Sequence, residues 1–391
     1  MLALDDVRIL DLTRLLPGGF CTLLLADFGA DVIKVEDTDG GDYLRWIPPM
    51  AGEFSAMFHA LNRNKRSITL NLKSAAGRDA FLRLAETADV VVESFRPGVL
   101  TRLGVDYAAL SQRNPRLILC SITGYGQDGP YRDRAGHDLN YAALAGVLSI
   151  TGCDWSHPAM PGLQAGDLGA GALHAALAIC AALHQRERTG EGQHCDIAML
   201  DGLISWMGVH AAGYFAGGEV PGPGTLLLNG RTPCYRIYPC QDGHLSLGAL
   251  EPKFWSNFVE AIGLPHLSAS GLVQGEEAAR VVAEIEAVLT QRTRAEWAAA
   301  FEGRDVCCEP LLRLDEVFAD AQVVHRGMRL PAGAGAPIDT CGFPIRLSAS
   351  PMTVRRPAPG YGEHTSLVLG EAGFDATAIA ELRAAGVTSD R

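Results

Sequence analysis

The alternation of strand-like and helix-like segments over the first 125 residues most strongly restricts the fold of this 391-residue chain. Short apolar runs rich in β-branched residues, typical of buried strands, recur between stretches with helical spacing. Ser74 stands where the N-cap of one of these helices is expected. Because repeated strand–helix–strand units form a parallel sheet covered on both faces, we predict a Rossmann-like α/β domain. The predicted strands are 7–12, 31–36, 67–72, 89–93 and 116–122, and the predicted helices are 19–28 and 75–88.

The second half of the chain is helical at first and then mixed. Ala- and Leu-rich stretches of low charge predict helices over 138–149 and 167–189, with Gly190 as a C-cap, and a further helix over 197–215. The Gly/Pro-rich segment 217–224 is typical of a linker. Later segments predict strands at 234–239 and 244–247 and helices at 252–262, 276–291, 294–302, 314–318 and 375–385.

These patterns divide the chain into a large and a small domain. We predict a large Rossmann-like domain over 1–200 that is completed by 335–391. A helical linker over 201–227 then leads to a smaller α+β domain over 228–330. The first βα turn lacks the GxGxxG spacing, so a nicotinamide or flavin site is only weakly indicated.

Charge and cysteine content exclude several classes of function. The net charge of -12 disfavours nonspecific attraction to nucleic acid or to an anionic membrane. Ten cysteines show neither a CxxC pair nor zinc-ligand spacing, which predicts reduced thiols and no metal site. No secretory signal precedes the first predicted strand, and the longest apolar run, 168–183, contains His174 and is short for a membrane span. We therefore expect a cytoplasmic protein that binds neither nucleic acid nor membranes.

Two short segments, 135–141 and 165–171, each place a proton-exchanging group just before an apolar helical stretch. His137 would lie at a helix N-terminus, with Asp138 available as the cap, where the macrodipole disfavours imidazolium and a general base could remain neutral. A surface histidine in a turn is the alternative, and the sequence alone favours it. Asp167 is surrounded by Gly166, Gly169 and Gly171, which indicate close approach of a ligand or of another backbone. A plain N-cap is the alternative for Asp167.

Other charged residues are candidates for supporting roles. Glu251 lies before Pro252, in the expected first turn of a helix. A carboxylate at a helix start is common, so this position alone does not indicate a function. Three cations are packed into residues 62–66, for which a solvated charge run is the alternative. Arg96 follows a predicted strand, and ligands of open parallel sheets bind beyond the carboxyl ends of strands.

Taken together, these motifs are similar to those of the family III CoA-transferase superfamily, and within it to the α-methylacyl-CoA racemase branch. The resemblance runs over nearly the whole chain, and the racemase branch is marked by His137 together with the Glu-Pro segment at Glu251. The motifs that carry it are 27–36, 62–66, 71–73, 93–98, 123–130, 190–201 and 362–365.

The resemblance implies a site for an acyl-CoA thioester and a reaction without a separate cofactor. It implies that His137, supported by Glu251, moves the α-proton on one face of a 2-methylacyl-CoA and that Asp167 moves it on the other. It also implies an interlocked homodimer. The large domain is then the CoA-binding domain, and the residues expected to contact CoA are Lys34, Arg63, Arg66, Leu70, Val91, Glu93, Arg96 and Gly136.

One position departs from the racemase pattern. Racemases commonly carry an arginine shortly after the second strand, where this chain has Asp37, so the phosphate contacts are expected from Lys34, Arg63, Arg66 or Arg96. Two alternatives to racemisation remain open. In a CoA-transferase Asp167 would act as a nucleophile, and in a CoA-binding protein without turnover none of these groups would react.

Overall fold

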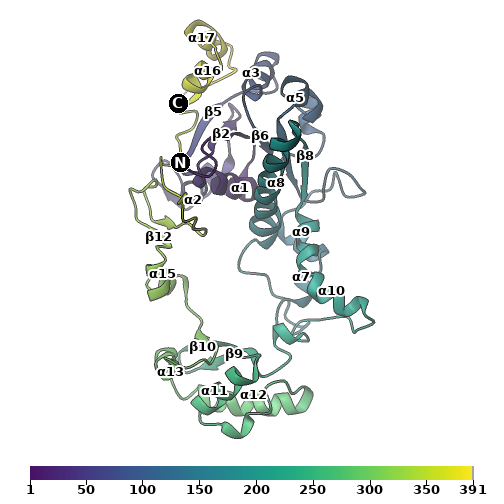
Figure 1. Cartoon of the computed structure of the whole chain (residues 1–391), viewed down its shortest axis with the longest axis vertical. Helices are drawn as coiled ribbons and strands as arrows, with labels where there is room; N and C mark the ends of the chain where they lie inside the picture. Colours follow the sequence, from purple (N-terminus) through teal and green to yellow (C-terminus); the bar gives the residue numbers. More distant parts are fainter. Residues whose placement is uncertain (390–391) are drawn as a thin grey trace. The chain divides into compact units, whose positions relative to one another are not determined.

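A computed structural model describes residues 1–389 of the chain and divides it into two compact units. Unit 1 comprises Met1–Ala145, Leu163–Trp206 and Ala321–Arg391, and unit 2 comprises Gly146–Gly162 and Met207–Asp320. The boundaries differ from the predicted ones, because the segment 146–162 belongs to unit 2 and the predicted linker is divided, with 201–206 in unit 1 and 207–227 in unit 2. Figure 1 shows both units with their helices and strands.

Unit 1 is built on a six-stranded parallel sheet with the strand order β5-β2-β1-β6-β7-β8. Numbered along the sheet's own strands, this order is 3-2-1-4-5-6, the Rossmann arrangement, which confirms the predicted fold class. The order reverses between β1 and β6, and such a switch point leaves a crevice beyond the carboxyl ends of the strands. The strands are β1 (Arg8–Asp11), β2 (Asp31–Glu36), β5 (Lys65–Thr69), β6 (Val90–Glu93), β7 (Ile118–Thr123) and β8 (His194–Ala198).

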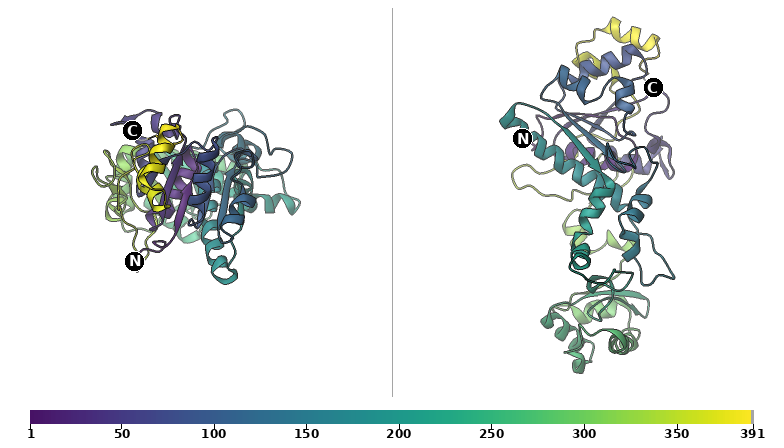
Figure 2. Two further views of the ribbon diagram at one scale, coloured as in Figure 1. Left: turned by 90° about the horizontal axis from the view of Figure 1, so that it is seen from above. Right: turned by 90° about the vertical axis from the view of Figure 1, so that its right-hand side faces the viewer.

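Helices cover both faces of this sheet (Figure 2). On one face, Leu10, Ile33 and Ile68 pack with helices that include the C-terminal pair, in a core that the predicted apolar runs supply. The helices of this face are α3 (Ala75–Ala85), α4 (Val99–Leu103), α5 (Tyr107–Arg113), α16 (Thr365–Glu371) and α17 (Ala376–Ala384). The other face is covered by α1 (Leu15–Asp27), the π-helical segment η2 (Ala165–Leu173) and α8 (His174–Thr189).

Several local predictions are confirmed. Ser74 is the N-cap of α3, with its hydroxyl accepting the backbone N–H of Gly77 at 3.0 Å. Gly190 ends α8 with a positive φ of 78°, where a side chain would be strained.

The remaining elements of unit 1 are η1 (Tyr43–Trp46), β3 (Met50–Ala51), β4 (Phe54–Ser55), α2 (Ala56–Asn62), α6 (Asp138–Leu144), α9 (Met199–Trp206), α15 (Ala321–His325), β12 (Arg329–Leu330) and β13 (Thr340–Cys341).

Two of the long helices predicted from the sequence are not continuous in the structure. The stretch 138–149 is divided into α6 and α7 at Gly146, whose φ of 81° interrupts the helix. The stretch 197–215 begins as the end of β8 and continues as α9 and α10. β8 lies at the edge of the sheet, and its exposed His194 and Asp196 interrupt the continuous apolar run by which the other parallel strands are recognised.

Unit 2 is an α+β unit, as predicted. Its antiparallel sheet has the order β11-β10-β9, and Trp255, Phe258 and Trp297 lie in the hydrophobic core that joins the sheet to its helices. Its elements are α7 (Val147–Ile150), α10 (Gly208–Phe215), η3 (Leu227–Asn229), β9 (Tyr235–Cys240), β10 (Gly243–Gly248), α11 (Pro252–Ala261), η4 (Pro265–Leu267), α12 (Gly275–Leu289), α13 (Arg294–Phe301), β11 (Cys308–Pro310) and α14 (Leu314–Val317).

The apolar segment Ala165–Thr189 needs a separate comment. By length and composition its 25 residues could cross a membrane, but half of its most apolar window is buried inside the protein. This burial is what a core helix of the sheet domain shows, and α8 packs against β7 and β8.

Candidate active site

A cavity of about 450 Å³ lies in unit 1 beyond the carboxyl ends of β1, β6 and β7. Its lining brings together His137 and Asp167, the two groups that the sequence singled out for proton transfer. Arg96 and Gly136 line the same cavity. We call this the catalytic cavity, because it combines an imidazole, a carboxyl group and cationic side chains at the switch point of the sheet.

His137 occupies the N-cap position of α6, and its side chain is exposed. Its backbone N–H donates to the Oδ1 atom of Asn140 at 3.0 Å, and its carbonyl accepts the N–H of Asn140 at 2.8 Å. This reciprocal bonding fixes the start of the helix and with it the backbone of His137, which lines the cavity. The cap position belongs to His137 itself, which corrects the expectation that Asp138 is the cap.

Asp138 instead interacts with the second candidate group. Its Oδ1 atom accepts the backbone N–H of Asp167 at 3.0 Å, which joins the start of α6 to the first turn of η2. Asp167 is half-buried, and burial together with the negative charge of Asp138 raises the pKa of its carboxyl group to about 7. A carboxyl group with such a pKa can both hold and accept a proton near neutral pH, as a general acid–base catalyst must.

The role of Asp167 as an N-cap is excluded by its position. Gln164 is the N-cap residue of η2, and Asp167 lies inside the first turn. This turn is π-helical, a geometry that is rare and often found at functional sites. The backbone N–H of Asp167 is already bonded to Asp138, so this amide is not free to donate to an oxyanion.

The three glycines around Asp167 are explained by side-chain packing. A Cβ atom on Gly169 would lie 1.9 Å from the Trp206 ring, and one on Gly166 would lie 2.8 Å from the Asp138 carboxylate. A Cβ on Gly171 would lie 3.0 Å from Met199. The expected close approach is real, and in this structure it is made by side chains of α6 and α9 and, at Gly171, also by the carbonyl oxygen of Gly166, 3.2 Å from the Cβ position.

A second cavity, of about 430 Å³, lies on the other side of the switch point, at the ends of β1, β2, β5 and β6. We call it the outer cavity. Leu70, one of the expected CoA contacts, lines it, and so does Lys73. Arg14 and Phe95 line both this cavity and the catalytic cavity, so the two cavities adjoin across the reversal of strand order.

Arg14 is a site residue that the sequence analysis missed. Its guanidinium forms an ion pair with Asp37, the residue that stands in place of the racemase arginine, and lies 5.2 Å from the centre of the Tyr43 ring. Arg132 and Arg134 also line the catalytic cavity. The rule that selected Arg96, a cation just after a buried strand, would have selected Arg14 as well, because β1 ends at Asp11.

Three of the expected phosphate-binding cations are internal ion pairs. Lys34 is fully buried with its ammonium 2.9 Å from the Asp42 carboxylate, and Arg63 donates two hydrogen bonds to Asp27. Arg66 pairs with Asp31 and Glu371. We correct their assignment, because charges committed to buried or half-buried carboxylates are not presented to a ligand at the strand ends. Val91 is likewise buried in the core.

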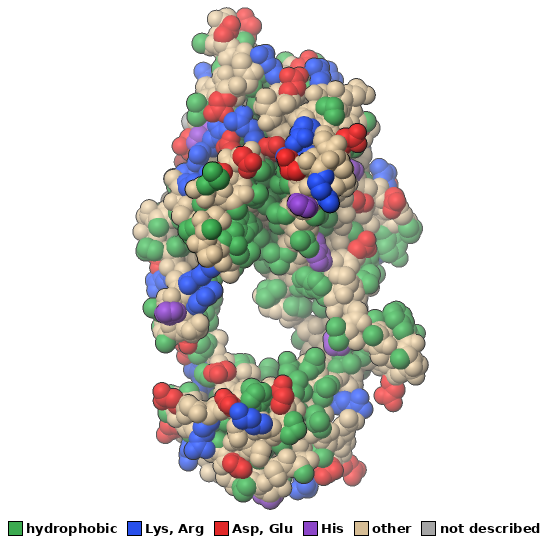
Figure 3. All heavy atoms as spheres, in the orientation of Figure 1, with side chains coloured by type: hydrophobic (Ala, Val, Ile, Leu, Met, Phe, Trp, Pro, Cys, Tyr) green, Lys and Arg blue, Asp and Glu red, His purple; other side chains and the backbone are tan. Residues whose placement is uncertain are grey.

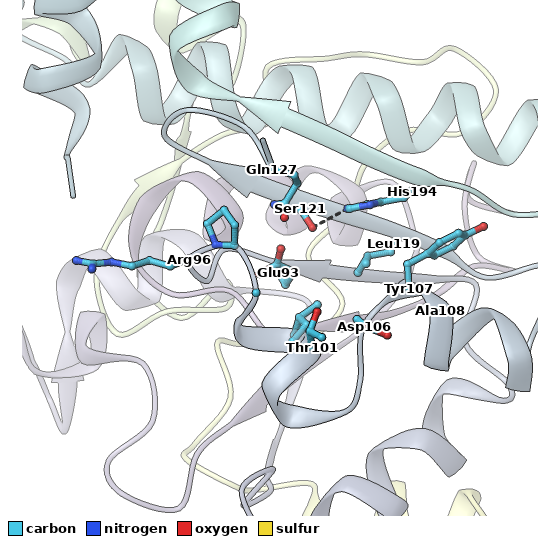
Figure 4. A pocket seen from close by; sticks show the side chains of 13 residues that line it. Glu93, Arg96, Thr101, Asp106, Tyr107, Ala108, Leu119, Ser121, Gln127 and His194 are labelled. Carbon is cyan, nitrogen blue, oxygen red and sulfur yellow. Dashed lines mark hydrogen bonds between the residues drawn. The ribbon is translucent and has the colours of Figure 1, made fainter. Parts of the chain in front are cut away.

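The two remaining predicted residues lie elsewhere. Glu93 is buried at the end of β6 and lines a third cavity, next to the catalytic one (Figure 4). Glu251 belongs to unit 2, where it is exposed at the N-cap position of α11, directly before Pro252. Its support of His137 stays a prediction. Among residues 1–389 no group of three or more His, Cys, Asp or Glu side chains could hold a metal ion.

Comparison with known proteins identifies the family. The sequence model of CoA-transferase family III matches residues 4–365. A succinate–glutarate CoA-transferase of Agrobacterium fabrum is 37% identical, over 94% of this chain and 95% of its own. The succinyl-CoA:glutarate CoA-transferase of Mus musculus is 36% identical, over 99% and 90%. The α-methylacyl-CoA racemase of Homo sapiens is 33% identical, over 97% and 96%.

A solved structure agrees with this result. The crystal structure of a CAIB/BAIF family protein from Brucella suis superposes with a TM-score of 0.84 at 32% identity, covering 95% of this chain and 99% of that one. The sheet order, the cavities at its switch point and the match over almost the whole sequence lead to the same assignment. The chain therefore belongs to CoA-transferase family III and is an enzyme of that superfamily.

Proposed function

We propose that the protein racemises 2-methylacyl-CoA thioesters by moving the α-proton between His137 and Asp167. The observation that carries the proposal is that these two groups, of different chemical type, line one cavity at the switch point of the sheet. Inverting a carbon centre by proton transfer requires one group that removes the proton from one face and another that delivers a proton to the opposite face. The relatives with racemase names support this reading.

The two adjoining cavities suit a long, bipartite substrate. In this proposal the acyl group lies in the catalytic cavity, and the nucleotide end of CoA lies in the outer cavity beside Leu70. Arg96 lies on the wall of the catalytic cavity, where a cation can bind the CoA phosphates. Arg14 lines both cavities, with its charge paired to Asp37. Four arginines line the catalytic cavity of a chain whose net charge is -12, which supports an anionic ligand: Arg14, Arg96, Arg132 and Arg134.

The chemical steps follow from ordinary acid–base chemistry. The neutral imidazole of His137, or the ionised carboxylate of Asp167, takes the α-proton, and the electron pair of the C–H bond moves into the thioester to form an enolate. The other group, in its protonated form, then delivers a proton to the opposite face of the same carbon. Each base is expected to contribute roughly 10²–10⁴-fold to the rate. The thioester carbonyl accommodates the charge, so the proposal requires no separate cofactor.

CoA transfer is the second candidate function, and it is favoured by the names of several relatives at 35–37% identity. In that reaction the Asp167 carboxylate attacks the thioester carbonyl and expels the CoA thiolate, which forms a mixed anhydride on the enzyme. An acceptor acid would then be needed to complete the transfer. Racemisation needs neither the anhydride nor the acceptor.

A labelling experiment separates the two functions. One stereoisomer of a 2-methylacyl-CoA is incubated with the enzyme in deuterated water, without any acceptor acid, and the α-position is followed by NMR and mass spectrometry. Deuterium at the α-carbon together with loss of stereochemistry supports racemisation. If CoA is transferred to added succinate or glutarate, and no α-proton exchange occurs when the acceptor acid is left out, racemisation is contradicted and the transferase is established.

The proposal includes a homodimer in a reducing compartment, the cytoplasm. Large hydrophobic side chains are exposed on η2, α8 and α9, which is common where a second subunit packs: Leu173, Leu177, Ile204 and Trp206. Figure 3 shows hydrophobic side chains gathered on the face of unit 1 where α1 and α8 lie. The proposal of a reducing compartment rests on the sequence, in which the ten cysteines, all unpaired in this structure, show no disulfide or metal-site spacing.

A further inference from the structure

The third cavity of unit 1, of about 240 Å³, contains a buried carboxyl group that proton transfer does not use. Glu93, Ser121 and His194 line it from three neighbouring strands, β6, β7 and β8. Figure 4 shows the Glu93 and Ser121 side chains pointing into it, with Ser121 Oγ bonded to His194 Nε2 at 2.9 Å. Glu93 and Ser121 are also paired in the sheet register, so their side chains lie on the same face.

The segment that follows Glu93 forms a wall of all three cavities. Phe95 lines the catalytic and outer cavities, and Arg96 and Pro97 line the catalytic cavity and the third one. We call residues 94–98 the β6–α4 loop. The Oε2 atom of Glu93 accepts a hydrogen bond from the backbone N–H of Phe95 at 2.7 Å, a short charge-assisted bond at the start of this loop.

The charge on Glu93 has no direct counterion. Its side chain is 3% exposed, and no Lys or Arg in residues 1–389 forms an ion pair with it. Arg96 lines the same cavity but extends away from Glu93 (Figure 4). A buried carboxylate without a counterion is unfavourable unless its hydrogen bonds compensate, and here these come from the Phe95 N–H and the Ser121 hydroxyl.

We propose that Glu93 is a positioning residue for CoA-thioester binding: its carboxylate holds the β6–α4 loop so that Phe95 and Arg96 form the walls of the two ligand cavities. The inference rests on the proposed function only in that a CoA thioester is the ligand, and it holds equally for racemisation and for CoA transfer. Glu93 lines the third cavity and neither the catalytic nor the outer one, so we assign it a positioning role rather than a contact with the substrate.

The proposal implies that CoA affinity depends on pH. Burial raises the pKa of Glu93 to about 7, against the hydrogen bonds that favour its ionised form. The groups that face it are Asp196 and His194 from β8, and Asp106 and Tyr107 line the cavity from the start of α5. Protonation replaces a charge-assisted hydrogen bond by a neutral one of roughly half the strength. The loop should therefore loosen as the pH falls through about 7.

The test measures binding of free CoA by isothermal titration calorimetry between pH 6 and pH 8. We compare the wild type with Glu93→Gln, which keeps an acceptor oxygen without the charge, and with Glu93→Ala, which removes the acceptor. Asp106→Asn is the matched control, because Asp106 lines the same cavity and caps α5 through the N–H of Ala109 without contacting the loop.

At pH 8, Glu93→Ala should raise the Kd for CoA about tenfold, as expected for the loss of one hydrogen bond to a charged group. Wild-type affinity should weaken from pH 8 to pH 6, and so should that of Asp106→Asn. Glu93→Gln should remove the part of this dependence that is centred near pH 7. In turnover assays KM should rise in Glu93→Ala while kcat changes little.

A Glu93→Ala variant that binds CoA with wild-type affinity would overturn the proposal. So would a Glu93→Gln variant with the wild-type pH dependence, a comparison that remains decisive if Glu93→Ala does not fold. Because free CoA has no acyl α-carbon, these results do not depend on racemisation. Conversely, an enzyme that fails to exchange the α-proton while Glu93 behaves as expected would reject only the proposed reaction.

Discussion

The carboxyl group of Asp167 is held in surroundings that favour its protonated form. Burial is the larger cause and the charge of Asp138 the smaller one, and together they raise its pKa from 3.8 to about 7. His137 and Asp167 could be selected from the sequence because each precedes an apolar helix, but the sequence could not show that Asp138 bonds to Asp167. That contact joins residues 29 positions apart and depends on how α6 meets η2.

The raised pKa of Asp167 predicts a pH-dependent loss of stability. Well below its ordinary pKa of 3.8 the group is protonated in both the folded and the unfolded state, so it does not change the free energy of unfolding. Between pH 4 and about 7 the unfolded state ionises first, and the free energy of unfolding therefore falls. Asp167→Asn, which stays neutral, should gain a few kcal/mol over the wild type at pH 8, roughly 1.4 per pKa unit. Urea unfolding at pH 4 and pH 8 measures this, and an equal difference at both pH values would contradict it.

Asp138→Asn should shift the pH dependence of catalysis. The asparagine keeps an oxygen for the N–H of Asp167 but removes the like charge, so the pKa of Asp167 should fall below its wild-type value of about 7. The inflection that Asp167 contributes to the pH profile of kcat/KM should move to lower pH by the same amount. Asp154→Asn serves as the control, since Asp154 lies in unit 2 and contacts His157 there. An unchanged inflection in Asp138→Asn would show that Asp138 does not influence the reacting carboxyl group.

At the scale of elements, the apolar runs are sufficient to locate strands. They do not show whether a charged side chain binds a ligand or pairs with another residue of the chain. Five of the six strands of the parallel sheet are predicted because buried parallel strands are continuously apolar. β8, with exposed His194 and Asp196, is not continuously apolar, and its last two residues fall in the predicted helix 197–215. The sequence predicts phosphate contacts for Arg63 and Arg66, because it does not show whether a carboxylate lies beside a cation. Asp27, 36 residues away at the end of α1, binds Arg63.

The correction at Arg63 is directly testable. Arg63→Ala leaves the buried Asp27 carboxylate without its cation and should lower the free energy of unfolding by roughly 3–5 kcal/mol. Arg96→Ala, an exposed arginine on the wall of the catalytic cavity, should weaken CoA binding with little change in stability. Denaturant titration and calorimetry on both variants make the comparison. A stable Arg63→Ala variant that binds CoA poorly would restore the original assignment of Arg63 to the phosphates.

At the scale of the whole molecule, the reversal of strand order between β1 and β6 explains where the site lies. Arg14 follows β1 and Arg96 follows β6, so the reversal brings them to adjoining cavities although they are 82 residues apart by number. The sequence predicted the α/β class and the strands, from which such a site can be expected. It could not show which loops cover the site, because loop positions depend on tertiary packing rather than on local patterns.

The central claim is that His137 and Asp167 act on opposite faces of one carbon, and isomer-resolved exchange tests it most directly. Each stereoisomer of a 2-methylacyl-CoA is incubated in deuterated water with His137→Ala and, separately, with Asp167→Ala, and deuterium at the α-carbon is measured at early times. We predict that each variant loses racemisation by roughly 10²–10⁴-fold but still exchanges the proton of one isomer, and that the two variants retain exchange of opposite isomers. Loss of exchange for the same isomer in both variants, or near-normal racemisation in either, would contradict the account.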